Sequence, residues 1–118
     1  MKVKEAGHTY ELSNFENKEA TGQTLQFIHK VPKCVLQVGI PEGMPNIAMP
    51  NGELETKSDG TTNEELLEVL IDRMNYLQSK FPCRENAIVI TKLEESLMWL
   101  NKRTADRLKR NVEGKHLK

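Results

Sequence analysis

The chain has 118 residues, 37% hydrophobic and 29% charged, and its 17 basic side chains balance 17 acidic ones. This length suits one globular domain, and seven Gly and five Pro are too few for a collagen-like or low-complexity chain. The longest apolar run, residues 87–90, is far shorter than the roughly 20 residues of a membrane span. The positively charged start lacks the apolar segment of a signal peptide, so we expect a cytoplasmic protein that does not enter a membrane.

No pattern of catalytic or metal-binding residues is present. The chain has no GxSxG, HExxH, P-loop or GxGxxG motif, no CxxC, and only three scattered histidines. Glu94 and Glu95 are adjacent on an expected helix, so they point about 100° apart and cannot flank one substrate. Without a secretory signal, Cys34 and Cys83 are expected to be buried free thiols. We therefore predict no catalytic residues, no metal, no cofactor and no enzymatic activity.

The zero net charge hides a division along the chain. Residues 1–83 carry 8 basic and 12 acidic side chains, a net charge of −4, and residues 84–118 carry 9 and 5, a net charge of +4. Such an asymmetry indicates an anionic partner, or the basic end of one subunit lying on the acidic half of another.

Short strands and loops are predicted for residues 1–60. Apolar and polar side chains alternate over residues 8–13, 25–27 and 36–40, which is the period of half-buried strands in a small antiparallel sheet. The polar stretch 14–22 is expected to form the first connection, and residues 30–33, which include a proline, the second.

A long loop is predicted for residues 41–60. This stretch contains three Pro and three Gly among acidic and small polar residues, with a turn expected at residues 50–52. Loops of this length are usually functional or mobile.

Two helices are predicted after the loop. Thr62 and Glu65 have the spacing of a capping box, in which the hydroxyl and the carboxylate each bond a backbone N–H at a helix start. This helix should end near Lys80, because Pro82 forces the preceding residue out of helical geometry. The second helix should begin at residue 83 or 84 and run to about Arg110, since no Gly or Pro interrupts it.

The expected architecture is α+β, with a small N-terminal antiparallel sheet followed by a long antiparallel helical hairpin. Residues 1–118 would form one domain, with strands and a long loop in residues 1–60 and the hairpin and a basic tail in residues 61–118. Helices of about 18 and 27 residues leave the second one overhanging its partner by roughly 13 Å. The small sheet and two helices offer little core, so we expect an oligomer.

One face of the second helix carries an aromatic ring and three guanidinium groups. Trp99, Arg103, Arg107 and Arg110 are spaced four, four and three residues apart, which places them on one side of a helix. Arginine binds phosphate oxygens in a bidentate manner, and a Trp or Arg plane stacks on a base. The alternative interpretation is a solvated basic face with Trp99 in the hydrophobic core.

A second cluster surrounds the turn at the opposite end of the hairpin. It contains Tyr76, Phe81, Arg84 and Asn86, although Phe81 also fits a core position and the latter two fit polar first-turn positions. Because Asn86 and Arg103 lie about 25 Å apart along one helix, a single subunit cannot bring both onto a small ligand. A two-fold dimer of antiparallel hairpins would set the turn of one chain beside the arginines of the other.

Residues 61–116 resemble the helical hairpin shared by two phage families, the anti-CBASS two proteins and the Thoeris anti-defence one proteins. Residues 84–116 carry most of this resemblance. The segments HTYEL and GQTLQFI resemble the N-terminal sheet of the Thoeris anti-defence one branch.

The resemblance implies a sponge that holds bacterial immune signals without cleaving them. The implied ligands are cyclic ADP-ribose isomers and cyclic di- or trinucleotides, bound between subunits of a homohexamer in the cytoplasm of the infected host. Arg103, Arg107 and Arg110 would contact the diphosphate, with Trp99 on the same face. Tyr76 would pack on a base, Asn86 would bond the ligand from the neighbouring chain, and Arg84 would serve a separate trinucleotide site.

Two other classes of function remain open on the sequence. A nucleic-acid-binding module would use the same basic stripe, although zero net charge disfavours a long polyanion. A phage structural or interaction protein would bind no small molecule.

Overall fold

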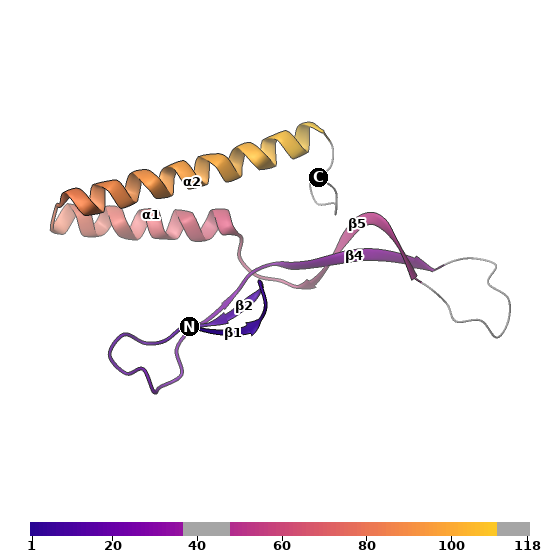
Figure 1. Ribbon diagram of the computed structural model, residues 1–118, viewed down its shortest axis with the longest axis horizontal. Coiled ribbons are helices and arrows are strands. Elements are labelled where there is room, and N and C mark those ends of the chain that lie inside the picture. Colours follow the sequence, from indigo (N-terminus) through magenta and orange to yellow (C-terminus); the bar gives the residue numbers. More distant parts are fainter. Residues whose placement is uncertain (37–47, 111–118) are drawn as a thin grey trace.

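The computed structural model describes residues 1–36 and 48–110. In this part of the chain a three-stranded sheet comes first, a two-stranded ribbon follows, and two long helices complete the order (Figure 1). The predicted α+β class, with small antiparallel sheets before a helical hairpin, is confirmed.

The three-stranded sheet contains β1 (Lys2–Glu5), β2 (Thr9–Glu11) and β3 (Thr24–Gln26), paired antiparallel in that order. The alternating segments 8–13 and 25–27 therefore form strands as predicted. The strand β1 was not predicted because three of its four residues are charged, a composition that an exposed edge strand tolerates.

The ribbon of β4 (His29–Leu36) and β5 (Ala48–Ser58) corrects two predictions. Residues 30–33 lie inside β4 instead of forming a connection, and the expected loop is a strand over residues 48–58, including the predicted turn at 50–52. Proline misled the prediction: Pro32 adjoins a register shift, and both strands of a two-stranded ribbon are edge strands, where proline is tolerated. Residues 37–47, with the rest of the expected third strand and of the loop, lie outside the described residues.

The hairpin consists of α1 (Asn63–Lys80) and α2 (Arg84–Lys109), as predicted. Thr62 Oγ1 accepts the Glu65 backbone N–H at 3.1 Å, which is the first half of the expected capping box. Between the helices, the Gln78 side chain accepts the Cys83 N–H at 3.0 Å and donates to the Cys83 carbonyl at 3.1 Å. The lengths of 18 and 26 residues leave an overhang of about 12 Å at the end of α2.

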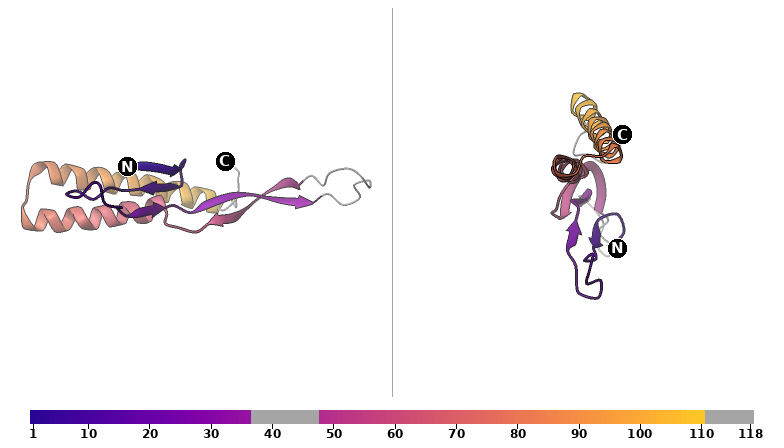
Figure 2. Two further views of the ribbon diagram at one scale, coloured as in Figure 1. Left: turned by 90° about the horizontal axis from the view of Figure 1, so that it is seen from below. Right: turned by 90° about the vertical axis from the view of Figure 1, so that its left-hand side faces the viewer.

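The molecule is thin and extended. Its extents are 70 × 42 × 15 Å, and its radius of gyration of 20.3 Å compares with about 13.5 Å for a compact chain of this length. Figure 2 shows the two helices side by side across its thin direction. Among the described residues no strand packs against either helix, and within residues 1–32 and 54–110, whose side chains are described, no apolar side chain is buried. The parts of the chain are therefore joined end to end instead of folding around one core.

This openness also corrects the prediction for Cys83, which is an exposed free thiol at the N-cap of α2. The side chain of Cys34 lies outside what the structure describes. Within residues 1–36 and 48–110, neither helix combines the length and the hydropathy of a membrane span.

Candidate ligand-binding face

The basic stripe lies on α2 and on its overhang. Spacings of four, four and three residues keep Trp99, Arg103, Arg107 and Arg110 within about 80° of arc on an unbroken helix. Trp99 is 62% exposed, and Arg103 and Arg110 are exposed as well. The alternative interpretation of Trp99 as a core residue is therefore wrong for this chain, and its indole is accessible to a ligand or to another subunit.

Arg107 differs from its neighbours because it is only 8% exposed, the single buried side chain among the described residues. The stripe thus combines two accessible guanidinium groups with one that is largely withdrawn from water. A buried guanidinium loses less hydration on meeting a phosphate, because most of that cost has been met on folding.

Most of the cluster at the turn is exposed, whereas Asn86 is half-buried. Phe81 is 81% exposed, which rules out the core position considered for it, and Tyr76 also faces solvent with Lys80 Nζ 5.5 Å from its ring centroid. Arg84 is the first residue of α2, and the Asn86 backbone N–H donates to Cys83 Sγ at 3.4 Å. Two aromatic rings and the Arg84 side chain are therefore presented to solvent at this end, whereas Asn86 is partly withdrawn from it.

The two clusters do not meet within one chain. Helix α2 runs without a break from Arg84 to Lys109, so Asn86 and Arg103 are separated by about 25 Å. The structure brings Tyr76 and Asn86 to one end of the hairpin and the arginine stripe to the other. A ligand touching both ends must bridge two subunits.

The hairpin has two faces of opposite charge. The seam between the helices is formed by half-buried apolar side chains such as Leu67 and Ile71 on α1 and Leu93 and Leu97 on α2. Because the two helices are antiparallel, side chains that are displaced from the seam by the same helical angle in the same direction along the chain lie on the same face of the hairpin. One face carries the α2 stripe together with Leu70, Arg73 and Lys92, and the other carries Glu64, Glu68, Asp72 and Glu94.

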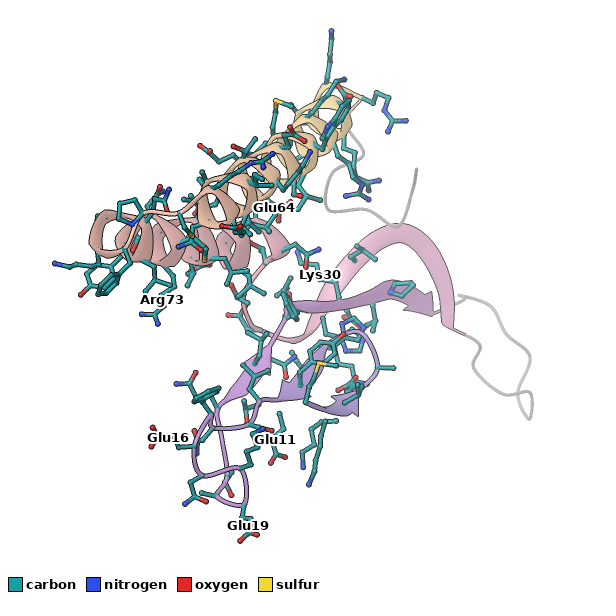
Figure 3. All side chains as sticks on the ribbon, turned by 60° about the vertical axis from the view of Figure 1, so that its left-hand side comes forward. Glu11, Glu16, Glu19, Lys30, Glu64 and Arg73 are labelled. Atoms are coloured by element: carbon teal, nitrogen blue, oxygen red, sulfur yellow. The ribbon has the colours of Figure 1, made fainter. Side chains whose placement is uncertain are left out.

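Figure 3 illustrates this division on α1, where Glu64 and Arg73 leave the helix in different directions. They are nine residues apart, which is half a turn of helical phase. Sequence reasoning missed Arg73 and Lys92 as neighbours of the stripe because it treated α2 alone. Aligning the apolar positions of both helices would have revealed the shared face.

Other chemistry is sparse in this region. Glu94 is exposed, and Glu95 lies 3.8 Å from Lys92 as an i,i+3 ion pair, so these carboxylates have separate surroundings. Within the described ranges no three His, Cys, Asp or Glu side chains are placed to hold a metal ion.

Comparison with known proteins connects this hairpin to a family. The family model of the Acb2/Tad1 hairpin domain matches residues 46–105, which include β5, α1 and most of α2. The chain belongs to this family. The match contains Tyr76, Arg84, Asn86, Trp99 and Arg103, whereas Arg107 and Arg110 follow its end.

A curated member of similar sequence is "Thoeris anti-defense 1" of Bacillus phage SBSphiJ7. It is 58% identical to this chain over 65 residues, which are 54% of this chain and 46% of that protein. The chain therefore matches about half the length of this relative.

Proposed function

We propose that this protein is a phage anti-defence sponge that binds a small cyclic nucleotide signal and holds it intact in the cytoplasm of the infected host. The observation that carries the proposal is the accessible Trp–Arg stripe on a hairpin of the Acb2/Tad1 family. The name of the Bacillus phage relative, "Thoeris anti-defense 1", supports the biological role.

The proposed ligands are cyclic ADP-ribose isomers, and cyclic di- or trinucleotides such as those of CBASS. Guanidinium forks suit diphosphate oxygens and an indole suits a base, so a small doubly charged nucleotide fits the stripe. The opposite face of the hairpin is acidic. A long polyanion would contact that face as well as the stripe and would be repelled by its carboxylates, so a long polyanion is disfavoured. The binding residues would be Trp99, Arg103, Arg107 and Arg110 at one end and Tyr76, Asn86 and Arg84 at the other.

Self-association is part of the proposal. The chain exposes 9491 Å² of surface, whereas a compact protein of 13.5 kDa exposes about 6500 Å². The excess is about 3000 Å² per chain, at least as much as one subunit of an obligate assembly buries, since such interfaces bury about 2000–5000 Å² counted over both partners. Pairing of two hairpins would set the turn of one beside the stripe of the other, and a homohexamer would repeat such pockets.

Binding without cleavage is tested by recovery of the ligand. Purified protein is mixed with a cyclic ADP-ribose isomer, the free ligand is quantified, and the complex is then denatured by heat. We expect the free ligand to fall and the intact ligand to reappear after denaturation. Recovery of a breakdown product would instead identify an enzyme.

The site itself is tested by a thermal-shift panel of cyclic ADP-ribose isomers, cyclic di- and trinucleotides and short oligonucleotides. Ligand at a thousandfold excess over Kd stabilises the protein by about 4 kcal/mol, a shift that Arg103→Ala and Arg107→Ala should each reduce. Lys102→Ala is the matched control, since it removes a cation from the overhang that is 3.2 Å from Asp106 and off the stripe. An unchanged melting temperature with every ligand would refute the sponge, and a response to oligonucleotides alone would favour nucleic-acid binding.

A further inference from the structure

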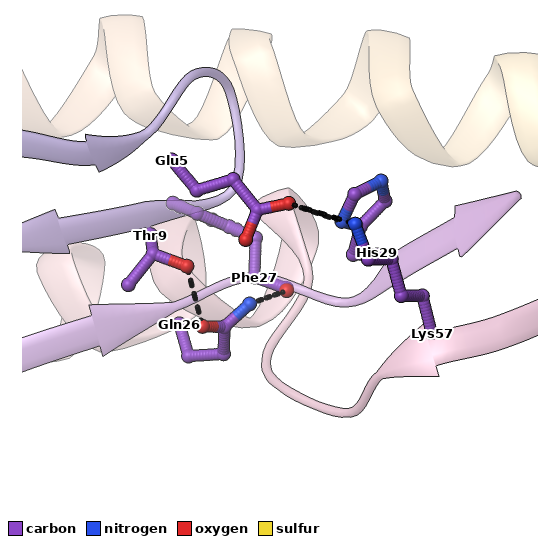
Figure 4. A network of polar contacts seen from close by, with 6 residues as sticks. All are labelled: Glu5, Thr9, Gln26, Phe27, His29 and Lys57. Atoms are coloured by element: carbon purple, nitrogen blue, oxygen red, sulfur yellow. Dashed lines mark hydrogen bonds and ion pairs between the residues drawn. The ribbon is translucent and has the colours of Figure 1, made fainter.

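The junction between the three-stranded sheet and the ribbon contains a compact group of ionisable side chains, of which Figure 4 shows Glu5, His29 and Lys57. His8 and His29 stack with ring centroids 3.5 Å apart and planes inclined by 7°. Glu5 Oε1 lies 2.9 Å from His29 Nδ1 and 3.6 Å from Lys57 Nζ. These groups come from the end of β1, the following turn, the start of β4 and the end of β5.

The local sequence places the group. Glu5 to His8 form a β-turn in which the His8 N–H donates to the Glu5 carbonyl at 3.0 Å. Gly7 occupies the third position with φ of +78°, the value of a type II turn that glycine adopts without strain. The His8 carbonyl then accepts the Phe27 N–H at 2.8 Å, so its ring is held beside the first residue of β4.

The junction determines how the parts of the molecule are arranged. Thr61 bridges to Phe27, donates to the Gln26 carbonyl at 2.9 Å and accepts the Ile28 N–H at 2.8 Å just before α1 begins. The sheet, the ribbon and the hairpin therefore converge on residues 26–29 and 58–61. Because no strand packs on either helix among the described residues, this junction carries their relative orientation.

The contact between Glu5 and His29 depends on a proton. The His29 side chain is 13% exposed, and its Nδ1 is buried without a partner in hydrogen-bonding geometry. The attraction at 2.9 Å is therefore one of charge, present when the imidazole is protonated and the carboxylate is ionised. Lys57 Nζ, 3.6 Å from the same carboxylate oxygen, places a second positive charge beside Glu5.

The stacking of His8 on His29 disfavours a second proton on the pair. Two parallel imidazolium rings 3.5 Å apart repel each other, and one carboxylate, already shared with Lys57, cannot neutralise both. The arrangement is thus favoured by one proton on the histidine pair. With no proton on the histidine pair the ion pair with Glu5 is lost. With two protons, like charges lie face to face in the stack, so both of these states weaken the arrangement.

We propose that Glu5, His8, His29 and Lys57 form a proton-dependent clasp that holds the ribbon against the three-stranded sheet most tightly when the histidine pair carries a single proton. Loosening of the clasp on either side of that state frees the ribbon to change its orientation relative to the three-stranded sheet. The geometry of any site formed between subunits then varies with pH.

Hydrogen exchange of the full chain between pH 5 and 8 tests the clasp, with protection factors removing the intrinsic dependence of exchange on pH. We expect protection of residues 26–31 and 57–61 to pass through a maximum and to fall about threefold or more toward both ends of the range. His8→Phe keeps an aromatic ring but cannot be charged, so it should lose the acid limb and keep the alkaline one. Glu5→Gln should lose the alkaline limb.

Glu11→Gln is the matched control, because it removes a carboxylate of the same sheet that is paired with Lys4 at 3.0 Å, and it should leave both limbs as in the wild type. An acid limb retained in His8→Phe, or protection of the wild type that does not vary across the range, would overturn the proposal. Should His8→Phe not fold, NMR titration of the wild type decides. The two junction imidazoles are expected to take up their protons in separate steps, and a single common step would contradict the clasp.

Discussion

In the helical hairpin two long elements lie side by side for most of their length, whereas the strand region consists of short elements joined by a few backbone bonds at one junction. The hairpin gains stability from a repeated apolar seam, so each position contributes a share. The strand region depends on close backbone approaches at single points. A substitution should therefore act through side-chain burial in the first region and through backbone geometry in the second.

The largest effect is expected at the seam. Leu97→Asp places a charge among half-buried apolar side chains and should cost about 2–4 kcal/mol of unfolding free energy. Thermal denaturation followed by circular dichroism at 222 nm measures the loss. Leu108→Asp, on the exposed overhang beyond α1, is the matched control. Equal losses from the two variants would contradict a seam as the source of stability.

A smaller but local effect is expected in the strand region. A Cβ at Gly22 would overlap the carbonyl oxygen of Leu12, where the Leu12 N–H donates to the Gln23 carbonyl at 2.7 Å. Gly22→Ala should cost about 1–3 kcal/mol and reduce hydrogen-exchange protection in β2 and β3, leaving the helices unchanged. Gly7→Ala has open space around the new methyl and should cost only about 1 kcal/mol for its positive φ. Loss of helical protection in Gly22→Ala would show that the regions are not independent.

A third effect on stability is expected at Thr62, the N-cap of α1, where the strand region meets the hairpin. Thr62→Ala removes the acceptor of the Glu65 N–H and should cost about 1 kcal/mol, with fraying confined to the first turn of α1. Thr62→Ser keeps the hydroxyl and should behave as the wild type. Equal melting temperatures for the Ala and Ser variants would show that the cap contributes nothing measurable.

The smallest effect is expected for the ion pair of Lys4 with Glu11 on the three-stranded sheet. The side-chain hydrogen bond and charge of Lys4, 3.0 Å from Glu11, lower the pKa of that carboxyl. A lowered pKa in the folded state means that this contribution is present at neutral pH and is lost as the pH falls through the folded pKa. Lys4→Gln should raise the pKa of Glu11 in a carboxyl NMR titration. Lys2→Gln, which removes a weaker charge contribution, should raise it less.

The hairpin was predictable because its signals are local. Thr62 with Glu65 marked the helix start, Pro82 marked the turn, and an apolar repeat of helical period ran between and beyond them. These features act within a few residues, so both helices end within a residue or two of the predicted bounds.

The strand region was only partly predictable, since pairing joins residues far apart in the sequence. Nothing near residue 50 indicates that it lies opposite Cys34, and its proline argued for a turn. The junction of Glu5, His8 and His29 was unpredictable for the same reason, because these residues come together only when the strands pair. For the candidate site, the spacing on α2 placed the stripe on one face, but the burial of Arg107 needed the structure.

A molecule 15 Å thick at its narrowest extent has almost no interior of its own. In the proposed assembly a second molecule would remove from water the large apolar side chains that one chain leaves exposed, such as Phe81 and Trp99, so folding and assembly would draw on the same free energy. Protein concentration then becomes a variable of stability, and each tenfold dilution weakens an obligate assembly by about 1.4 kcal/mol for each association step. Such an assembly would be stable at high protein concentration and would dissociate at low concentration.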